Sequence, residues 1–343
     1  MLDKLNNIAK KITLVFVFIF LLSICGTGQV ARGEERVVTD MIGRKVELPN
    51  KVERVVTTYK PATQFILALG AQDRLVAGAR GMPLQILFTL MEGNVNQLPK
   101  VGSKSGINLE AIVAQEPDLV ITDPHRSGPQ AAEKLKKQGI ATIIIKPESF
   151  QQIKEANRLI GSALNLPEKA QKINDQYDKI LKLTERVKNL PQEEKKKVYF
   201  ANSSLLDTVG GGMLQTDLIE MAGAINPAKK AKKGFMEISP EQLIKWNPDT
   251  VIISQFYRGK IDKLLEDEKY QSLKAFKDKN IYRIPSQLEP WDFPSPSSPL
   301  IAIWLAEKLY PEKYEDVDLE QVINDFYKKV YGQSYDQFLK NIE

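Results

Sequence analysis

The chain has 343 residues and a formal net charge of +5 at pH 7, with 48 Lys and Arg against 43 Asp and Glu. This length exceeds one ordinary hydrophobic core and predicts two domains. Lysine-rich runs at residues 193–197 and 229–233 are typical of solvated surface rather than of a nucleic-acid footprint, so no nucleic-acid partner is expected. Because Cys25 is the only cysteine, no disulfide or CxxC redox pair forms within the chain.

Residues 1–28 are typical of an export signal, because three lysines precede an apolar run over residues 12–24 and small residues follow it. The run is short for a membrane span, and an uncleaved anchor is the alternative. Cleavage is expected before Gln29 or before Glu34. Cys25 ends the run in "LSIC", which resembles a lipoprotein acylation site, although a bulky Ile stands where such sites have a small residue. The protein is therefore expected to be exported, either periplasmic or tethered to the outer face of the membrane.

From residue 37 the chain alternates between short β-branched runs and helical patterns, which is typical of α/β layering. The middle of the chain repeats the plan of the first part, because in both a predicted strand leads to a helix that a glycine ends. These segments are residues 52–58, 62–71 and 74–79, and then residues 196–202 and 214–224. The predicted fold class is α/β, with two Rossmann-like lobes.

One unit is written twice. "INLEAIVAQEPDLVITD" at residues 107–123 and "ISPEQLIKWNPDTVIIS" at residues 238–254 share six of 17 positions at an offset of 131. In each copy an Asn or Ser cap opens a short helix, and a proline ends it before a strand. Glu110 and Glu241 therefore lie in the first turn of a helix, where a carboxylate gains roughly 0.3–1 kcal/mol from the helix dipole.

A helical stretch separates the two parts. Its inward positions recur at spacings of three and four residues and are Ala170, Ile173, Tyr177, Ile180, Thr184 and Val187. Twenty-odd helical residues span roughly 30 Å, enough to cross from one lobe to the other, whereas a surface helix of one lobe is the alternative. Near the C-terminus, residues 297–311 and 318–332 are predicted to be amphipathic helices on the second lobe, with Trp304 in the core.

These patterns divide the chain into four parts. The predicted boundaries are a signal peptide at 1–28, an N-terminal α/β lobe at 34–148, a helical region with the interlobe helix at 149–190, and a C-terminal α/β lobe at 191–343.

Catalytic and metal motifs have little support. His125 is the only histidine, so any catalytic triad must use it and multi-histidine metal sites are excluded. The sequence has no HExxH, EF-hand or Walker A pattern. Neither an enzyme nor a cofactor is expected, and an enzyme centred on His125 is the alternative.

Polar and aromatic residues follow the predicted strands, where open α/β sheets place their ligand crevice. The candidate ligand-binding residues are Tyr59, Lys60, Arg80, Lys104, His125, Arg126, Thr208, Met213, Gln215, Tyr257, Arg258, Trp291, Asp292 and Phe293. Cations and aromatics at strand ends suggest a cleft for an anionic or ring-bearing small molecule.

The export signal, "VTDMIGRKVELPNKVERVV", the paired units and the connecting helix resemble the substrate-binding proteins of ABC importers for iron-siderophores, haem and vitamin B12, over residues 37–332. This resemblance implies two lobes joined by one long helix, with the ligand between them and little closure. It also implies a monomer when free, and a partner that is an ABC permease dimer with its ATPase subunits. Glu110 and Glu241 match the glutamates with which these proteins dock onto permease arginines. A receptor that hands its ligand to a signalling partner is the alternative.

A negatively charged ferric chelate is the favoured ligand, with haem or a corrinoid in the same class. Its expected clamps are three arginines and its expected walls three aromatics: Arg80, Arg126, Arg258, Tyr59, Tyr257 and Trp291. The alternative ligand, molybdate or tungstate, needs fewer aromatics and more convergent N–H and guanidinium donors. One histidine and no available thiol disfavour a bare transition-metal ion.

Overall fold

The computed structural model describes residues 36–79, 85–91, 98–103, 106–125, 127–231 and 234–342. Five of the predictions above fall outside these residues: the signal peptide and the roles of Cys25, Arg80, Lys104 and Arg126.

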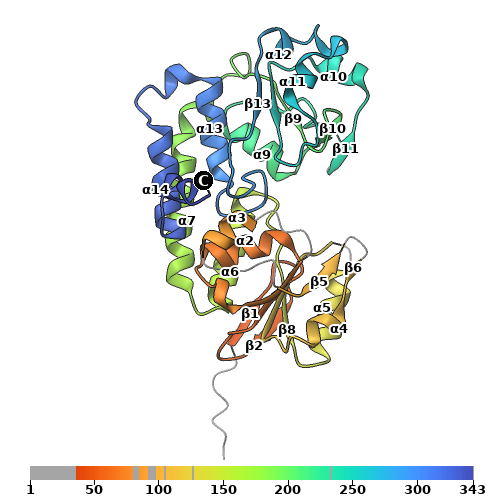
Figure 1. Ribbon diagram of the computed structural model, residues 1–343, viewed down its shortest axis with the longest axis vertical. Coiled ribbons are helices and arrows are strands. Elements are labelled where there is room, and N and C mark those ends of the chain that lie inside the picture. Colours follow the sequence, from red (N-terminus) through yellow and green to blue (C-terminus); the bar gives the residue numbers. More distant parts are fainter. Residues whose placement is uncertain are drawn as a thin grey trace, which may run out of the picture. The chain divides into compact units, whose positions relative to one another are not determined.

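Within these ranges, the first sheet has six strands in the order β6-β5-β4-β3-β7-β8, parallel except for the β5–β6 pair (Figure 1). The strands are β3 (Val55–Thr57), β4 (Leu75–Ala79), β5 (Lys100–Ser103), β6 (Gly106–Ile107), β7 (Leu119–Thr122) and β8 (Ala141–Ile144). Every residue of β3 and β7 is buried, as expected for central parallel strands covered on both faces. A hairpin of β1 (Arg36–Thr39) and β2 (Lys45–Leu48) precedes the sheet.

The helices between the strands of this sheet are α2 (Lys60–Ala68), η1 (Gln72–Arg74), α3 (Gln85–Leu90), α4 (Leu109–Val113) and α5 (Gly128–Lys136). Helix α6 (Phe150–Ala163) follows the last strand, β8. The strand and helix predicted over residues 52–71 are confirmed as β3 and α2, and Gly70 follows α2 with a left-handed φ of 63°.

The second sheet, as far as the structure describes it, has three parallel strands in the order β13-β12-β9. These are β9 (Val198–Ala201), β12 (Thr250–Ile253) and β13 (Ile281–Arg283), and the hairpin β10 (Asp207–Val209) with β11 (Phe235–Glu237) lies beside them. The helices of this part are α9 (Leu214–Met221), α10 (Pro240–Trp246), α11 (Ile261–Leu265), η2 (Glu268–Tyr270) and α12 (Lys274–Lys277). The predicted α/β fold class is confirmed.

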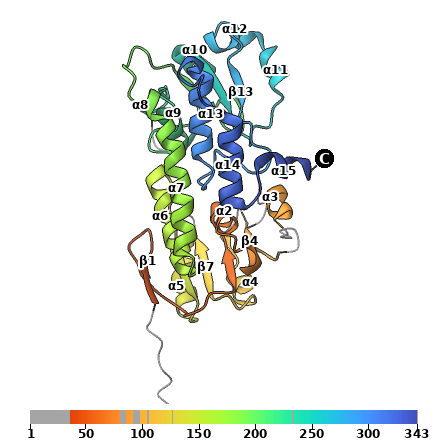
Figure 2. The ribbon, with the colours of Figure 1, turned by 90° about the vertical axis from the view of Figure 1, so that its left-hand side faces the viewer.

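Between the two sheets in the chain lie α7 (Pro167–Leu183) and α8 (Glu185–Lys188). All six predicted inward positions are buried. The predicted helix divides at Thr184, whose hydroxyl donates a hydrogen bond to the carbonyl of Leu181 at 2.7 Å. Helix α7 packs against α6, which belongs to the first part of the chain, and against two helices from the C-terminal part (Figure 2).

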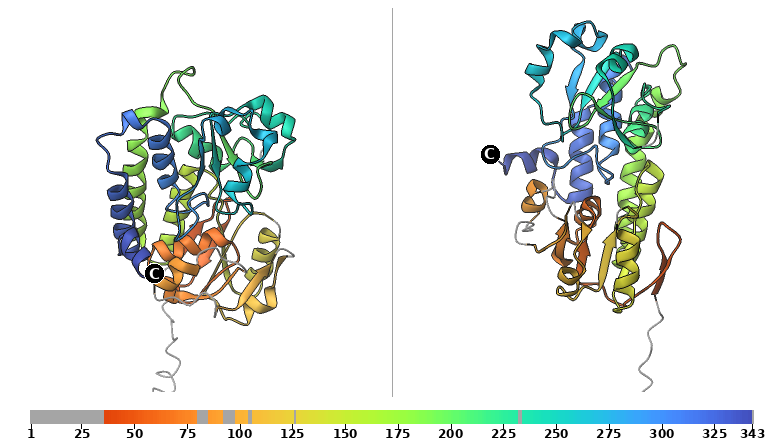
Figure 3. Two further views of the ribbon diagram at one scale, coloured as in Figure 1. Left: turned by 45° about the horizontal axis from the view of Figure 1, so that its top comes forward. Right: turned by 90° about the vertical axis from the view of Figure 1, so that its right-hand side faces the viewer.

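The C-terminal helices are α13 (Pro299–Leu309), η3 (Pro311–Lys313), α14 (Leu319–Tyr331) and α15 (Tyr335–Lys340). Trp304 is buried, as predicted. Helix α13 packs against α7 and α9, whereas α14 packs against α7, α13 and also α2 of the first part, a contact that the prediction of packing on the second lobe did not include (Figure 3). The apolar face of α14 carries Tyr327 and Tyr331, whose hydroxyls bond to Glu289 and Ser297 in the loop before α13. The lobe boundaries stay a prediction.

The repeated unit folds alike in its two copies. Asn108 and Ser239 cap α4 and α10 by accepting backbone N–H bonds of 3.0 and 3.2 Å, as predicted. The residues before the two prolines have left-handed φ angles of 45° and 43°, and these are Glu116 and Asn247. A residue in the left-handed conformation followed by proline prevents a helix from continuing. The same local signal therefore ends the short helix of each copy.

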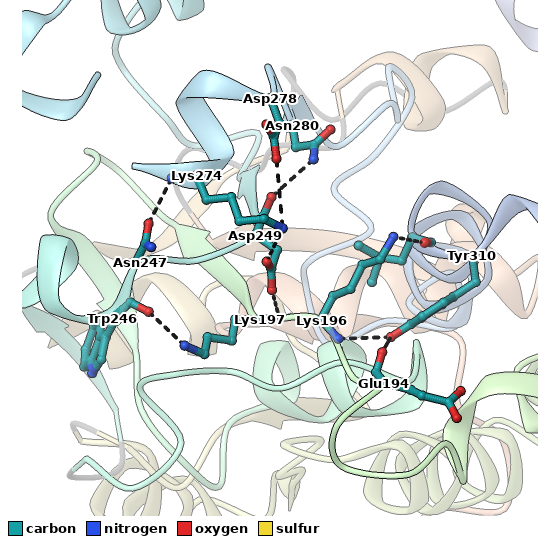
Figure 4. Close-up of polar contacts among 11 residues, drawn as sticks. Glu194, Lys196, Lys197, Trp246, Asn247, Asp249, Lys274, Asp278, Asn280 and Tyr310 are labelled. Atoms are coloured by element: carbon teal, nitrogen blue, oxygen red, sulfur yellow. Dashed lines mark hydrogen bonds and ion pairs between the residues drawn. The ribbon is translucent and has the colours of Figure 1, made fainter. Parts of the chain in front are cut away.

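The aspartate after the proline of the repeat makes equivalent hydrogen bonds in the two copies. The carboxylate of Asp118 accepts the backbone N–H of Arg54 at 2.8 Å, and that of Asp249 accepts the N–H of Lys197 at 2.8 Å. Figure 4 shows the second copy, where Lys274 adds an ion pair to Asp249 at 2.6 Å. Each aspartate thereby ties the entry of its own strand to the entry of the neighbouring strand.

Gly223 ends α9 in a conformation that only glycine adopts without strain. Its φ is 74°, and a Cβ at this position would lie 2.6 Å from the carbonyl oxygen of Val187. We expect Gly223→Ala to lower the unfolding free energy by about 2–4 kcal/mol, through strain and overpacking together. The matched control is Gly139→Ala, which has a φ of 76° but open space around the Cβ, and we expect it to cost only about 1–2 kcal/mol. Equal losses in urea unfolding would contradict the prediction.

Candidate ligand-binding site

The carboxyl ends of β3 and β7 lie side by side in the first sheet. The hydroxyl of Thr58 donates to that of Thr122 at 2.7 Å, which ties the two ends together. Tyr59 follows as the N-cap residue of α2, partly buried. Burial and the negative charges of Asp123 and Glu148 raise the pKa of Tyr59, so its hydroxyl stays protonated at neutral pH.

His125 lies at the same edge with acidic neighbours. Its Nε2 is 3.0 Å from Oε1 of Glu148, and its backbone N–H donates to Asp123 at 2.8 Å. Lys146 approaches the other carboxylate oxygen of Glu148 at 3.8 Å. The structure therefore brings the predicted residues Tyr59 and His125 to one edge, where two carboxylates accompany them. Lys60, also predicted, opens α2 there.

A second group surrounds Asp292 in the loop before α13. The Ser254 hydroxyl, just after β12, donates to Oδ2 of Asp292 at 2.5 Å. The side-chain amide of Gln215, at the start of α9, donates to the backbone carbonyl of Asp292 at 2.9 Å. Oδ1 of Asp292 and Oε1 of Gln215 are buried and accept no hydrogen bond. The structure thus brings together two predicted residues from distant parts of the sequence.

Burial raises the pKa of Asp292 from 3.8 to about 6, against the lowering effect of the Ser254 hydroxyl. The folded protein therefore binds this proton more tightly than the unfolded chain, so the stability that the neutral form provides is complete below about pH 4 and lost by about pH 6. Relative to Asp292→Asn, the wild type is expected to lose about 2–3 kcal/mol of unfolding free energy between pH 4 and pH 7. Urea unfolding at both pH values measures this difference, and parallel pH profiles would contradict it.

The predicted aromatic residues differ in depth. Trp291 is 1% exposed, and its indole N–H donates to the hydroxyl of Tyr327 at 2.9 Å. The ring of Phe293 is partly exposed and lies 5.1 Å from that of Phe256, centroid to centroid. Tyr257 is also partly exposed. Phe293, Phe256 and Tyr257 are accordingly better placed than Trp291 to contact a ligand.

Three other predicted residues lie around β9 and β12. Thr208 is fully buried and donates its hydroxyl to the carbonyl of Phe200 at 2.7 Å. Met213 is the partly exposed N-cap residue of α9. Arg258 is exposed, and its backbone N–H bonds to the carbonyl of Ser203 at 3.1 Å. Thr208 is therefore a structural residue of the core, whereas the side chains of Met213 and Arg258 are accessible to a ligand.

The sequence reasoning did not select Asp123, Glu148 or Phe256. A signal was present for Asp123, because it follows β7 directly at the carboxyl end of a central strand. Glu148 comes shortly after β8 in the same way. The prediction of an anionic or ring-bearing ligand favoured cations and aromatics at the strand ends and did not include these two acids.

A groove of about 670 Å³ lies elsewhere, along α9 and the segment after α8. Its lining includes Phe150, Lys188 and Lys195, and a pair formed by Glu220 with Lys229. No candidate ligand-binding residue lines it. The carboxyl-end site and this groove are therefore different places on the molecule.

The two glutamates of the repeat are exposed. Glu110 and Glu241 each occupy the second position of their helix, α4 and α10. Hydrogen bonds from its own backbone N–H and from the Ser239 hydroxyl lower the pKa of Glu241. A fixed negative charge at this position suits contact with a basic partner.

In the part of the chain that the structure describes, no group of three or more His, Cys, Asp or Glu side chains is arranged to hold a metal ion. Over the same residues, no helix is both long and apolar enough to cross a membrane.

Comparison with known proteins gives related sequences and folds. The family model described as periplasmic binding protein matches residues 55–288. The molybdate-binding protein MolA of Haemophilus influenzae is 25% identical over 325 residues, 88% of this chain and 92% of that protein, and its molybdate-bound structure superposes with a TM-score of 0.76. A vitamin B12-binding protein of Vibrio parahaemolyticus is 25% identical over 60% of this chain and 71% of its own.

A further solved structure, that of Helicobacter pylori CeuE with Ni(II) bound, has a TM-score of 0.77 at 24% identity, covering 90% of this chain and 99% of CeuE. This likeness supports the fold. Because the family model spans well over half of the sequence, from β3 to the loop before α13, the chain belongs to the periplasmic binding protein family.

Proposed function

We propose that this protein is the exported solute-binding component of an ABC importer and that its ligand is a metal chelate, such as a ferric siderophore, haem or a corrinoid. The ligand would lie between Tyr59 and His125 at the edge of the first sheet and the Asp292–Phe293 segment beside the second. One observation carries the choice of ligand: two carboxylates, Asp123 and Glu148, stand beside Tyr59 and His125 at the edge of the first sheet.

The hydrogen-bonding character of these residues disfavours an oxyanion. An oxyanion presents only hydrogen-bond acceptors, and a carboxylate has no donor to offer it. A chelate that carries N–H or O–H groups, including those of metal-bound ligands, donates hydrogen bonds to these carboxylates. It also brings apolar surface for aromatic side chains to contact. The partly exposed rings of Phe256, Phe293 and Tyr257 provide that apolar contact.

Molybdate or tungstate is the second candidate. The specific observation in its favour is the similarity to MolA, which extends over 88% of this chain. An oxyanion would need convergent N–H and guanidinium donors. Arg258 is one exposed guanidinium at the edge of the second sheet.

A thermal-shift screen of the purified protein tests the proposal. The ligands are ferric siderophores, ferric citrate, haem, cobalamin, molybdate and tungstate, each added in excess. A ligand at 100 times its Kd stabilises the folded state by roughly 2.7 kcal/mol, which gives a clear rise in Tm. We expect stabilisation by a chelate and none by the oxyanions. Stabilisation by molybdate or tungstate alone would refute the chelate proposal and leave the importer proposal intact.

The proposed partner is an ABC permease dimer with its ATPase subunits, and the proposed docking residues are Glu110 and Glu241. Two exposed glutamates in equivalent helices fit a partner with two equivalent faces. Exposed ion pairs contribute little affinity individually, so these contacts are expected to set orientation and association rate.

A further inference from the structure

A buried carboxylate joins helices from the two parts of the chain. Glu289 is 1% exposed. Its Oε2 accepts a hydrogen bond from the side-chain amide of Gln64 in α2 at 2.9 Å. Its Oε1 accepts from the hydroxyl of Tyr327 in α14 at 3.0 Å and from the hydroxyl of Ser297. Three donors from three separate segments thus converge on one side chain.

This carboxylate costs free energy to bury and keeps its place only with its donors. Burial raises the pKa of Glu289, and the hydrogen bonds from Ser297 and Gln64 oppose that rise. Loss of one donor from a buried charged group typically costs more than the net gain from the bond. The contact between Glu289 and Gln64 is therefore well suited to fix α2 against the loop before α13.

The same loop is also bound to the second sheet. Asp292 lies three residues after Glu289, and it receives the hydrogen bonds from Gln215 in α9 and Ser254 after β12. Hydrogen bonds at its two ends and the backbone of residues 289–292 between them therefore link α2 to α9 and to Ser254 after β12. Hydrogen-bond networks and rigid secondary elements are the structures that carry energetic coupling between distant sites.

Both ends of this link lie close to the proposed ligand contacts. Tyr59 precedes Gln64 by five residues at the start of α2, a distance of about 7.5 Å along a helix. At the other end, Asp292 and Phe293 directly follow the loop segment that Glu289 anchors. We infer that Glu289 is a positioning residue, which holds the Tyr59 edge and the Asp292–Phe293 edge at a fixed separation before any ligand binds. This role rests on the proposed ligand site lying at these two edges.

A distance measurement that needs no ligand tests the inference. Spin labels are placed at two exposed positions, Lys137→Cys after α5 and Lys277→Cys in α12, in the full chain carrying Cys25→Ser. We expect a narrow distribution of label-to-label distances in this reference protein. Gln64→Ala or Glu289→Gln should broaden the distribution roughly twofold, because the two edges then move relative to each other.

The matched control is Asn174→Ala. Asn174 is equally buried, and its side chain bonds to Asn157 at 3.0 Å between α6 and α7, away from the loop. We expect it to lower stability without broadening the distribution. The Gln64→Ala variant keeps the donors from Tyr327 and Ser297, so it tests the inference even if Glu289→Gln fails to fold. An unchanged distribution in a folded Gln64→Ala protein would overturn the inference.

A binding measurement separates the inference from the proposed function. With ferric citrate as the probe, we expect Gln64→Ala to weaken the Kd about tenfold through lost preorganisation, and Asn174→Ala to leave it unchanged. If the reference protein does not bind ferric citrate, ferric citrate is excluded as the ligand, whereas the broadened distances in Gln64→Ala would still support the positioning role. Equal Kd values for reference and Gln64→Ala proteins that both bind would show that the fixed separation does not serve ligand binding, and would overturn the inference.

Discussion

Replacement of Glu110 and Glu241 together by lysine is expected to abolish ligand uptake while leaving the affinity of the isolated protein for its ligand unchanged. Both side chains are exposed and lie in α4 and α10, outside the two edges proposed to hold the ligand. Two carboxylates that meet basic residues of a permease become four units of charge more positive, so attraction turns into repulsion. Like-charge contact across an interface costs several kcal/mol, enough to prevent productive docking.

The chain offers a matched control for this pair. Glu168 in α7 and Glu320 in α14 are also exposed and also occupy the second position of their helices. Glu168→Lys with Glu320→Lys therefore makes the same change in charge and loses the same favourable helix-dipole interaction. Uptake of radiolabelled ligand by cells is measured for both double variants, with equal protein levels. Normal uptake in the Glu110/Glu241 variant, or an equal loss in the control, would remove the docking role.

Periodic patterns predicted the fold because they report which side of an element is buried. The helical stretch between the two parts shows this best, since all six positions chosen by their spacing are buried, in α7, in α8 or at Thr184 between them. The helices of the repeated unit were also predicted correctly, because a helix cap or a proline affects only the few residues next to it. The packing of α14 on α2 was missed, since an amphipathic pattern identifies an apolar face but not the partner of that face.

The candidate site was harder to predict from the sequence, because the position of a residue in a loop does not indicate how deeply its side chain is buried. Trp291 and Phe293 are two residues apart in the same loop, yet one is buried against Tyr327 and the other is partly exposed. Likewise, the bonds of Glu289 to Gln64 and Tyr327 span 225 and 38 residues, and no local pattern announces them. Such contacts depend on how the elements assemble, which the spacing of residues within one element does not determine.

Trp291→Ala is expected to lower the unfolding free energy by about 3–5 kcal/mol, because a fully buried indole leaves a cavity that its surroundings fill only partly. The substitution also removes the N–H donor to the hydroxyl of Tyr327. Trp291→Phe, which keeps most of the apolar volume, is expected to cost about 1–2 kcal/mol for the lost hydrogen bond. Urea unfolding monitored by circular dichroism measures both losses.

Phe293→Ala, in the same loop, is expected to change ligand affinity more than stability. Its ring is partly exposed and packs against that of Phe256, so we expect it to cost only about 1 kcal/mol of stability. Because this ring is proposed to contact the ligand, its removal should weaken the Kd for the chelate identified by thermal shift about tenfold. Trp291→Phe should leave that Kd within about twofold, since its side chain contacts the core. If Trp291→Phe lost affinity and Phe293→Ala kept it, Trp291 would be the ligand wall, and the loop would have to move when the ligand binds.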